Sequence, residues 1–271
     1  MIKRLAIIIE SSNVKGQQYL PGAKIDVANW VSFLKSDLGG KWADGEIIEL
    51  PKPTSACIQL FLKAFKERYV FLAFSGHGYE EYDPYSRKYV SKICLNDNEQ
   101  SVAIDTVCPK SFGTAIFDCC RGVEDVCAHI SIANESIALN KTISLTQKTA
   151  MDSAGRGFAS ARGTMMNKDF RRCFMMELAN KTTHEVVRMY SCSRNESAME
   201  FKGDPKAGGY YTTFLMRGAE AWYKERLCCP YCDVYTTKQA HETACEIMRQ
   251  INPQQHPEYT PLCQSYPFAV G

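Results

Sequence analysis

The sequence lacks any apolar run long enough to cross a membrane as a helix, which takes about 18 residues. Its first residues, MIKRLAIIIESSN, resemble the start of a signal peptide. However, the apolar part is only the five residues LAIII, and no small-residue cleavage site follows. We therefore interpret this segment as a buried strand and expect no membrane partner.

The sequence also lacks an excess of charge of one sign. Its 32 Lys and Arg residues nearly balance 30 Asp and Glu residues, for a net charge of +2. Binding to nucleic-acid phosphates needs a concentrated basic face, so we expect no nucleic-acid partner. Internal repeats, low-complexity tracts and glycine-rich phosphate-binding motifs are absent too, so a nucleotide site would have to be irregular.

Cysteine, in contrast, is abundant, with 13 residues in a chain of 271. A secreted disulfide scaffold would be shorter and would show a regular cysteine framework. Here the cysteines fall in predicted strands and helices as often as in loops, which indicates a reducing cytoplasm and mostly free thiols. The 45% of hydrophobic and 23% of charged residues are typical of a globular protein with a real core.

Strand and helix patterns alternate along the first half of the chain. Continuous apolar runs predict strands, and apolar residues at helical spacing predict helices that end near Gly39-Gly40 and Arg68. The expected strands are 4–9, 46–50, 69–75, 114–119, 185–193 and an edge strand at 265–270. The expected helices are 21–38 (apolar Ile25, Ala28, Val31, Leu34 and Leu38), 55–68, 168–180, 208–226 and, after a turn and a Thr cap, 237–251. This order predicts an α/β fold with a mostly parallel sheet and helices on both faces.

Two glycine-flanked motifs follow buried strands: SGHG at 75–78 and DCCRG at 118–122. Ligands bind at the carboxyl ends of parallel strands, so neighbouring strands would bring His77 beside a cysteine of the second motif. A thiol attacks a carbonyl as thiolate and needs such a base. The backbone N–H groups of Gly78 and Cys120 are candidate donors to the oxyanion. This pattern alone leaves ordinary packing roles open.

The segments FLAFSGHG and AIFDCCRG resemble the strand-end motifs of the caspase, metacaspase and paracaspase clan of cysteine proteases. In that resemblance, Cys120 aligns with the nucleophile and Cys119 with the variable residue before it. Arg121 and Gly122 match the animal caspase form, and Asp118 matches the metacaspase form. Segments along nearly the whole chain are similar to the family's other elements, which suggests a prokaryotic or metacaspase-like member.

The resemblance implies a single caspase-like domain over 1–271, a three-layer sandwich around a central six-stranded, mostly parallel sheet, with an exposed linker at about 145–168. It also implies a cysteine endopeptidase that acts on proteins or peptides, with a role in cell death or defence. Cys120 would attack the scissile carbonyl, and His77 would protonate the leaving amine and then activate water. No third member of a triad is evident in the sequence.

Substrate preference follows from the same alignment. In metacaspases an acidic S1 pocket takes Arg or Lys, and the matching positions are Asp26, Asp118 and Ser75. Two carboxylates suit a guanidinium, so we expect cleavage after Arg, with Lys second. Many metacaspases carry an Asp near 192–196, where this chain has Arg194. If Arg194 points outward, Glu196 is left to serve the pocket.

Control of such a protease is expected, by autoprocessing, by a partner or by a small signalling ligand. The basic segment that carries Arg156, Arg162, Arg171 and Arg172 lies where caspases are cut into two chains, and it is equally a solvated basic loop.

No cofactor is predicted. Some metacaspases need calcium, and Asp97, Glu99 and Asp105 are available, but no ligand loop is recognisable, so calcium dependence stays open.

Rival interpretations remain. A pseudoprotease or a ligand-gated switch would use the same fold for binding alone. Cys229 and Cys232 form a CPYC motif typical of redox proteins, in the wrong structural context. With His241 and Cys245 they could instead bind zinc, at an uncommon spacing, or be ordinary thiols.

Overall fold

The computed structural model describes residues 3–66, 68–98, 101–123, 168–182, 185–226 and 231–271. Nearly all of them belong to one compact unit, formed by residues 1–124 and 169–271. Residues 125–168 make a second unit, and nearly all of it, including most of the predicted linker at 145–168, lies outside the described residues. Within the described part, no helix is long and apolar enough to cross a membrane.

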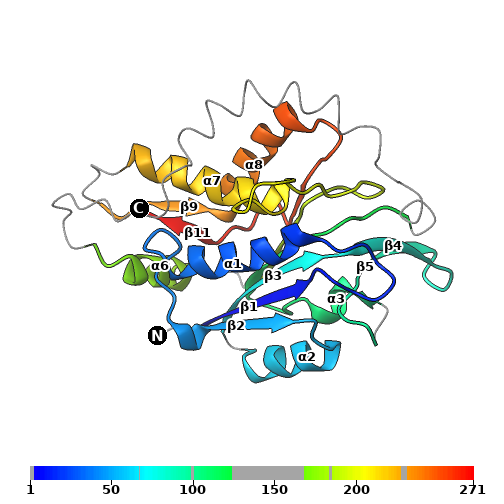
Figure 1. Ribbon diagram of the computed structural model, residues 1–271. Helices are drawn as coiled ribbons and strands as arrows, with labels where there is room; N and C mark the ends of the chain where they lie inside the picture. The colour runs from blue at the N-terminus through cyan, green and yellow to red at the C-terminus, as the bar shows by residue number, and fades with distance from the viewer. Residues whose placement is uncertain (1–2, 67, 99–100, 124–167, 183–184, 227–230) are drawn as a thin grey trace. The chain divides into compact units, whose positions relative to one another are not determined.

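A six-stranded sheet forms the centre of the larger unit (Figure 1). Its strands are β1 (Arg4–Ser11), β2 (Ile47–Pro51), β3 (Tyr69–Gly76), β7 (Gly113–Asp118), β8 (Val186–Tyr190) and β10 (Glu258–Thr260). They lie in the order β10-β8-β7-β3-β1-β2, and only β10, at one edge, is antiparallel to its neighbour. The predicted α/β class with a mostly parallel sheet is confirmed.

Helices cover both faces of this sheet, as predicted (Figure 1). They are α1 (Pro21–Lys35), α2 (Ser55–Ala64), α3 (Ile104–Val107), α6 (Phe170–Ala179), α7 (Tyr210–Glu225) and α8 (Thr237–Ile251), with a short 3-10 helix at Asp44–Glu46. The core on one face contains side chains from α1, α6, α7 and α8, and the core on the other contains side chains from α2 and α3. β1, β3 and β7 are buried almost throughout because both faces are covered.

The remaining strands form two small sheets outside the central one. β4 (Gly78–Asp83), β5 (Lys88–Ile93) and β6 (Val102–Ala103) make an antiparallel sheet that begins directly after His77. β9 (Val234–Thr236) and β11 (Pro267–Val270) pair with each other.

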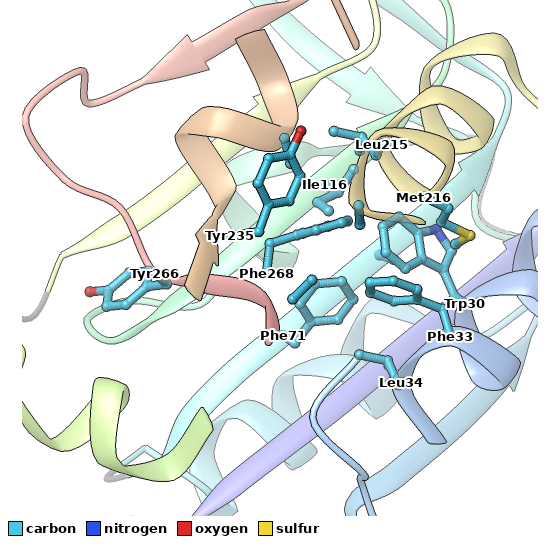
Figure 2. Close-up of a cluster of buried hydrophobic side chains, with 14 of the residues drawn as sticks. Trp30, Phe33, Leu34, Phe71, Ile116, Leu215, Met216, Tyr235, Tyr266 and Phe268 are labelled. Carbon is cyan, nitrogen blue, oxygen red and sulfur yellow. The ribbon is translucent and has the colours of Figure 1, made fainter. Parts of the chain in front are cut away.

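The terminal strand corrects one expectation. Residues 265–270 were predicted as an edge strand, but β11 pairs with β9 outside the central sheet and is buried throughout. Phe268 packs against Trp30 and Phe33 at ring distances of 6.0 and 5.1 Å, in the core between α1 and the sheet (Figure 2). The outer position in the central sheet is taken instead by β10, in a segment whose prolines hid its strand character.

Helix α1 also differs from the expected pattern. It ends at Lys35 rather than near Gly39, and its buried face carries Ala23, Asp26, Trp30 and Phe33. Ile25, Ala28 and Val31 lie at the margin or outside of that face. The buried face of α1 was not recognised from the sequence because one of its buried residues, Asp26, is a carboxylate. Asp26 is also a residue of the candidate site described below.

Candidate active site

The two glycine-flanked motifs, SGHG and DCCRG, meet at the carboxyl ends of two neighbouring strands of the central sheet. β3 and β7 are parallel neighbours, with Ser75 opposite Asp118 in their register. A Cβ atom added at Gly78 would lie 2.7 Å from Cys119 Sγ and 2.9 Å from the carbonyl oxygen of Cys120. The backbone after His77 therefore packs directly on the cysteine segment, and only a glycine fits there.

The His77 imidazole is half-buried, and its Nε2 lies 2.6 Å from the carbonyl oxygen of Gln18. A carbonyl oxygen can only accept, so Nε2 carries a proton and Nδ1 is the nitrogen left for exchange with a thiol. Burial lowers the pKa of His77, and the hydrogen bond to Gln18 acts in the opposite direction. This contact of His77 could not be read from the sequence, because its partner is a backbone atom.

Cys119 and Cys120 have different surroundings. Cys119 is 3% exposed, and burial raises the pKa of its thiol well above the ordinary value, which keeps it protonated. Cys120 is only half-buried, and its Sγ lies 3.8 Å from the carbonyl oxygen of Ala198. This contrast favours Cys120 as the reactive thiol. The oxyanion roles of the Gly78 and Cys120 N–H groups stay a prediction.

The predicted S1 residues Asp26, Ser75 and Asp118 come together. Asp26 is 1% exposed and accepts hydrogen bonds from Ser75 Oγ at 2.7 Å and from the N–H of Gly209 at 3.0 and 3.1 Å. Asp118 is 6% exposed and accepts from the N–H and hydroxyl of Thr212 at 3.1 and 2.7 Å. Both carboxylates thus lie at the N-terminus of α7, where the helix dipole favours negative charge.

A third carboxylate, which the sequence did not reveal, joins this pair. Glu200 is half-buried and accepts a hydrogen bond from the N–H of Gly22 at 3.0 Å, in the first turn of α1. It follows β8 in a segment with no strand or helix pattern, so only the folded chain assigns it. We call Asp26, Asp118 and Glu200 the acidic cluster.

The electrostatics of the acidic cluster are unfavourable for three free carboxylates. Burial raises the pKa of Asp26, and the nearby Asp118 raises it further. Burial likewise raises the pKa of Asp118 and of Glu200. Within the described part of the chain, no Lys or Arg nitrogen lies within 4.0 Å of any of the three. Burial and mutual repulsion therefore disfavour the ionised forms of these carboxyls, and the charge of Lys202 acts against this at Glu200.

Glu196 was predicted to line the S1 pocket; its backbone oxygen accepts the N–H of Arg121 at 2.9 Å, but its carboxylate is bound outside the acidic cluster. Its carboxylate pairs with His256 Nδ1 at 2.7 Å and accepts the N–H groups of His256 and Ser193 at 2.7 and 3.1 Å. It thereby holds the turn at 193–196 to the segment before β10. Arg194 is exposed and turned towards Glu80, at 3.9 Å.

Arg121, in the DCCRG motif, binds residues that follow the SGHG motif and β8. It is 4% exposed, its Nε lies 3.0 Å from Glu80 Oε1, and its Nη1 lies 2.5 Å from Glu258 and 3.2 Å from the carbonyl oxygen of Cys192. Its guanidinium also stacks over Tyr190, 4.4 Å from the ring centroid. These contacts fix the backbone next to Cys120.

Two predicted autoprocessing residues are in an unsuitable conformation. Arg171 and Arg172 lie in the first turn of α6, and Arg171 forms a bidentate pair with Glu46 at 2.7 and 2.6 Å. A protease binds the chain it cuts as an extended strand. A peptide bond within a helix, such as those after Arg171 and Arg172, is therefore a poor substrate. Arg156 and Arg162 lie outside the described residues.

The alternative zinc or redox site near the C-terminus lies partly outside the described residues, because Cys229 is among those left out. Cys232 is disulfide-bonded to Cys173. His241 Nδ1 contacts Tyr211 at 2.8 Å, and burial lowers the His241 pKa to about 4. Burial raises the pKa of the neighbouring Cys245 to about 11, so this thiol is not activated.

The two described carboxylates that were considered for calcium are both paired with a cation. Asp97 pairs with Lys52 at 3.1 Å, and Asp105 pairs with Arg188 at 2.7 Å. Among the described residues, no group of three or more His, Cys, Asp or Glu side chains is arranged to hold a metal ion. Glu99 lies outside that part of the chain, and calcium dependence stays untested.

Comparisons with known proteins agree with the fold. A family model described as "Caspase domain" matches residues 3–263. The crystal structure of caspase-1 from Spodoptera frugiperda superposes with a TM-score of 0.52 at 12% identity, covering 96% of this chain and 87% of that one. No curated protein matches the sequence. The chain belongs to the caspase-domain family of cysteine peptidases.

Proposed function

We propose that this protein is a cysteine endopeptidase that cleaves after Arg, and less well after Lys, with Cys120 as nucleophile and His77 as base. The observation that carries the proposal is the acidic cluster, whose member Asp118 lies two residues before Cys120 in the chain. Three carboxyls with raised pKa values, none of them within 4.0 Å of a Lys or Arg nitrogen among the described residues, favour a positively charged guest that would lower those pKa values.

The chemistry of the acidic cluster favours a guanidinium over an ammonium. Arg presents five N–H donors in a planar fork and can bind two carboxylates bidentately, whereas Lys offers a single charged point. Glu200, the half-buried member, is accessible to an arriving cation, and Asp26 and Asp118 lie deeper. Binding of the substrate cation would also relieve the repulsion among the three carboxylates.

The mechanism assigns one role to each group near Cys120. His77 Nδ1 takes the thiol proton, and the Cys120 sulfur attacks the scissile carbonyl carbon. The proton then passes to the leaving amine, and a thioester remains on Cys120. His77 next takes a proton from water, whose oxygen attacks the thioester carbon. The C–S bond breaks, the acid is released, and the proton on His77 returns to the Cys120 sulfur. Throughout, the Gln18 carbonyl oxygen holds Nε2–H, which fixes the ring in one tautomer.

A set of fluorogenic peptides that differ only in their P1 residue tests the proposal. We expect kcat/KM to rank Arg above Lys and both far above Asp or norleucine, and Cys120→Ala to abolish cleavage. Asp26→Asn should lower kcat/KM for the Arg peptide by about thirtyfold to a thousandfold, because the buried guanidinium of the substrate loses a carboxylate partner.

Glu196→Gln is the matched control, since this carboxylate pairs with His256 and not with the acidic cluster. It should leave the P1 preference unchanged. Full activity of Asp26→Asn on the Arg peptide would refute the assignment of the acidic cluster to substrate recognition.

A further inference from the structure

The carbonyl oxygen that holds His77 belongs to a segment with little packing of its own. Residues 15–19 are exposed, and the internal hydrogen bonds of the segment are Gln17 N–H to Val14 O at 3.0 Å and Leu20 N–H to Ser12 O at 2.9 Å. Val14 is buried and anchors one end. We call residues 12–20 the carbonyl loop. Something beyond apolar packing must keep Gln18 at its place.

One side chain ties the exposed part of the carbonyl loop to the rest of the molecule. Asp97 Oδ1 accepts the N–H of Lys15 at 2.6 Å, and its Oδ2 pairs with Lys52 Nζ at 3.1 Å. The hydrogen bond from Lys15 and then the pair with Lys52 lower the pKa of Asp97, so it stays ionised at neutral pH. A charged acceptor makes the bond to Lys15 about twice as strong as a neutral one.

Asp97 belongs to the same segment that holds the backbone of His77. The N–H of Cys94 donates to the His77 carbonyl oxygen at 3.0 Å, and the Leu95 carbonyl oxygen accepts from Ser11 Oγ at 2.8 Å. Residues 94–97 therefore contact His77 through Cys94 and the carbonyl loop that carries Gln18 through Asp97 and Lys15.

We propose that Asp97 is a positioning residue for the base: it acts through Lys15 and Gln18 to keep the Nε2–H of His77 hydrogen-bonded and Nδ1 directed to the thiol. The inference rests on the proposed peptidase function. Loss of the Asp97 tether frees Gln18 and lets the imidazole change tautomer or rotate. The catalytic rate then falls, while substrate binding at the acidic cluster, built from other residues, is retained.

The first test compares Asp97→Ala, Asp97→Asn and Asp83→Ala in the full chain. Asp97→Ala should lower kcat for the Arg peptide about tenfold, with KM within about twofold. Asp97→Asn keeps an oxygen for the Lys15 N–H and should restore most of the rate. Asp83, at the end of β4, is the matched control, because its carboxylate also accepts backbone N–H groups, from Tyr85 and Ser86 in the exposed turn before β5.

A second variant removes the donor and leaves the acceptor. Lys15 and Gly16 are the central residues of the turn closed by Gln17 N–H and Val14 O, and the φ of +81° at Gly16 is that of a type II turn. Such a turn favours proline at its first central position. Lys15→Ala removes the side chain alone and is the control, whereas Lys15→Pro keeps the turn and removes the N–H as well. It should reproduce the loss of Asp97→Ala, and the double variant should lose no more than either alone.

Nitrogen-15 NMR of the imidazoles gives a readout that does not depend on peptide cleavage. Wild type and Asp83→Ala should show His77 as the Nε2–H tautomer, and Asp97→Ala and Lys15→Pro should show mixed tautomers. An unchanged tautomer and rate in Asp97→Ala and Lys15→Pro, or an Asp97→Asn variant as impaired as Asp97→Ala, would overturn the inference. A wild type that cleaves no Arg peptide would instead overturn the proposed function, while the NMR test stands.

Discussion

At the scale of single residues, the site combines side chains that sequence motifs reveal with groups that they cannot. His77, Cys120 and Asp118 follow strands with recognisable flanking glycines, and Asp26 and Ser75 follow from the family alignment. The Gln18 contribution is a backbone oxygen, which has no residue-type signal. Glu200 lies in an irregular segment, and only its approach to Gly22 places it in the acidic cluster.

Glu196 is the opposite case, a residue that the sequence suggested for the site and that the structure pairs with another residue. It is an acidic residue close to the end of β8 in sequence, and this made it the natural choice for the pocket. Its partner His256, 60 residues away, could not be predicted from sequence.

The raised pKa of Asp26 predicts a pH dependence of stability. A carboxyl whose pKa is higher in the folded state keeps a proton that the unfolded chain has already released. Stability therefore falls as pH rises from the unfolded pKa through the folded pKa. Asp26→Asn removes this term, so the Tm of the variant minus that of wild type should increase from acidic to neutral pH. A difference that is flat with pH, measured by thermal unfolding of both proteins, would show that Asp26 is not destabilised by burial.

At the scale of elements, the strand-end segments were predictable and the outer elements were not. β1, β3 and β7 are continuous apolar runs, which only a sheet covered on both faces can bury. The pairing of β11 with β9 and the edge position of β10 depend on contacts across the chain. Short strands of three or four residues carry too little pattern to be placed by sequence alone.

The close packing of the segments after β3 and β7 predicts a sharp effect of one methyl group. A Cβ at position 78 would come within 3 Å of Cys119 Sγ and Cys120 O, so Gly78→Ala must displace the cysteine segment. We expect kcat/KM to fall about a hundredfold, since a shift of about 1 Å is enough for that loss. Gly45→Ala is the control, because a Cβ there meets no atom within 4 Å and the residue is exposed. Equal activity of the two variants would contradict the described contact between the motifs.

At the scale of the whole molecule, the proposed preference for Arg suggests that the enzyme cuts itself. Arg156 and Arg162 precede α6 in the chain, and β8, which follows α6, pairs with β7 in the central sheet. A cut before α6 would therefore leave two pieces joined by the sheet and its cores.

Intact-mass measurement under denaturing and native conditions tests autoprocessing. We expect wild type to give two fragments when denatured and one undivided mass when native, whereas Cys120→Ala stays a single chain. Replacing Arg156 and Arg162 by Gln should prevent the cut, and replacing Arg171 and Arg172 should not, because they lie in α6. Cleavage that persists without Arg156 and Arg162 would place the processing site elsewhere.

The most direct test of the central claim is covalent labelling with a peptidyl acyloxymethyl ketone that ends in Arg, followed by peptide mapping. The account predicts one adduct, on Cys120 and not on Cys119, that is lost in Asp26→Asn and absent with a norleucine-ended reagent. An adduct on a different cysteine, or equal labelling by the Arg and norleucine reagents, would contradict the assignment of nucleophile and acidic cluster.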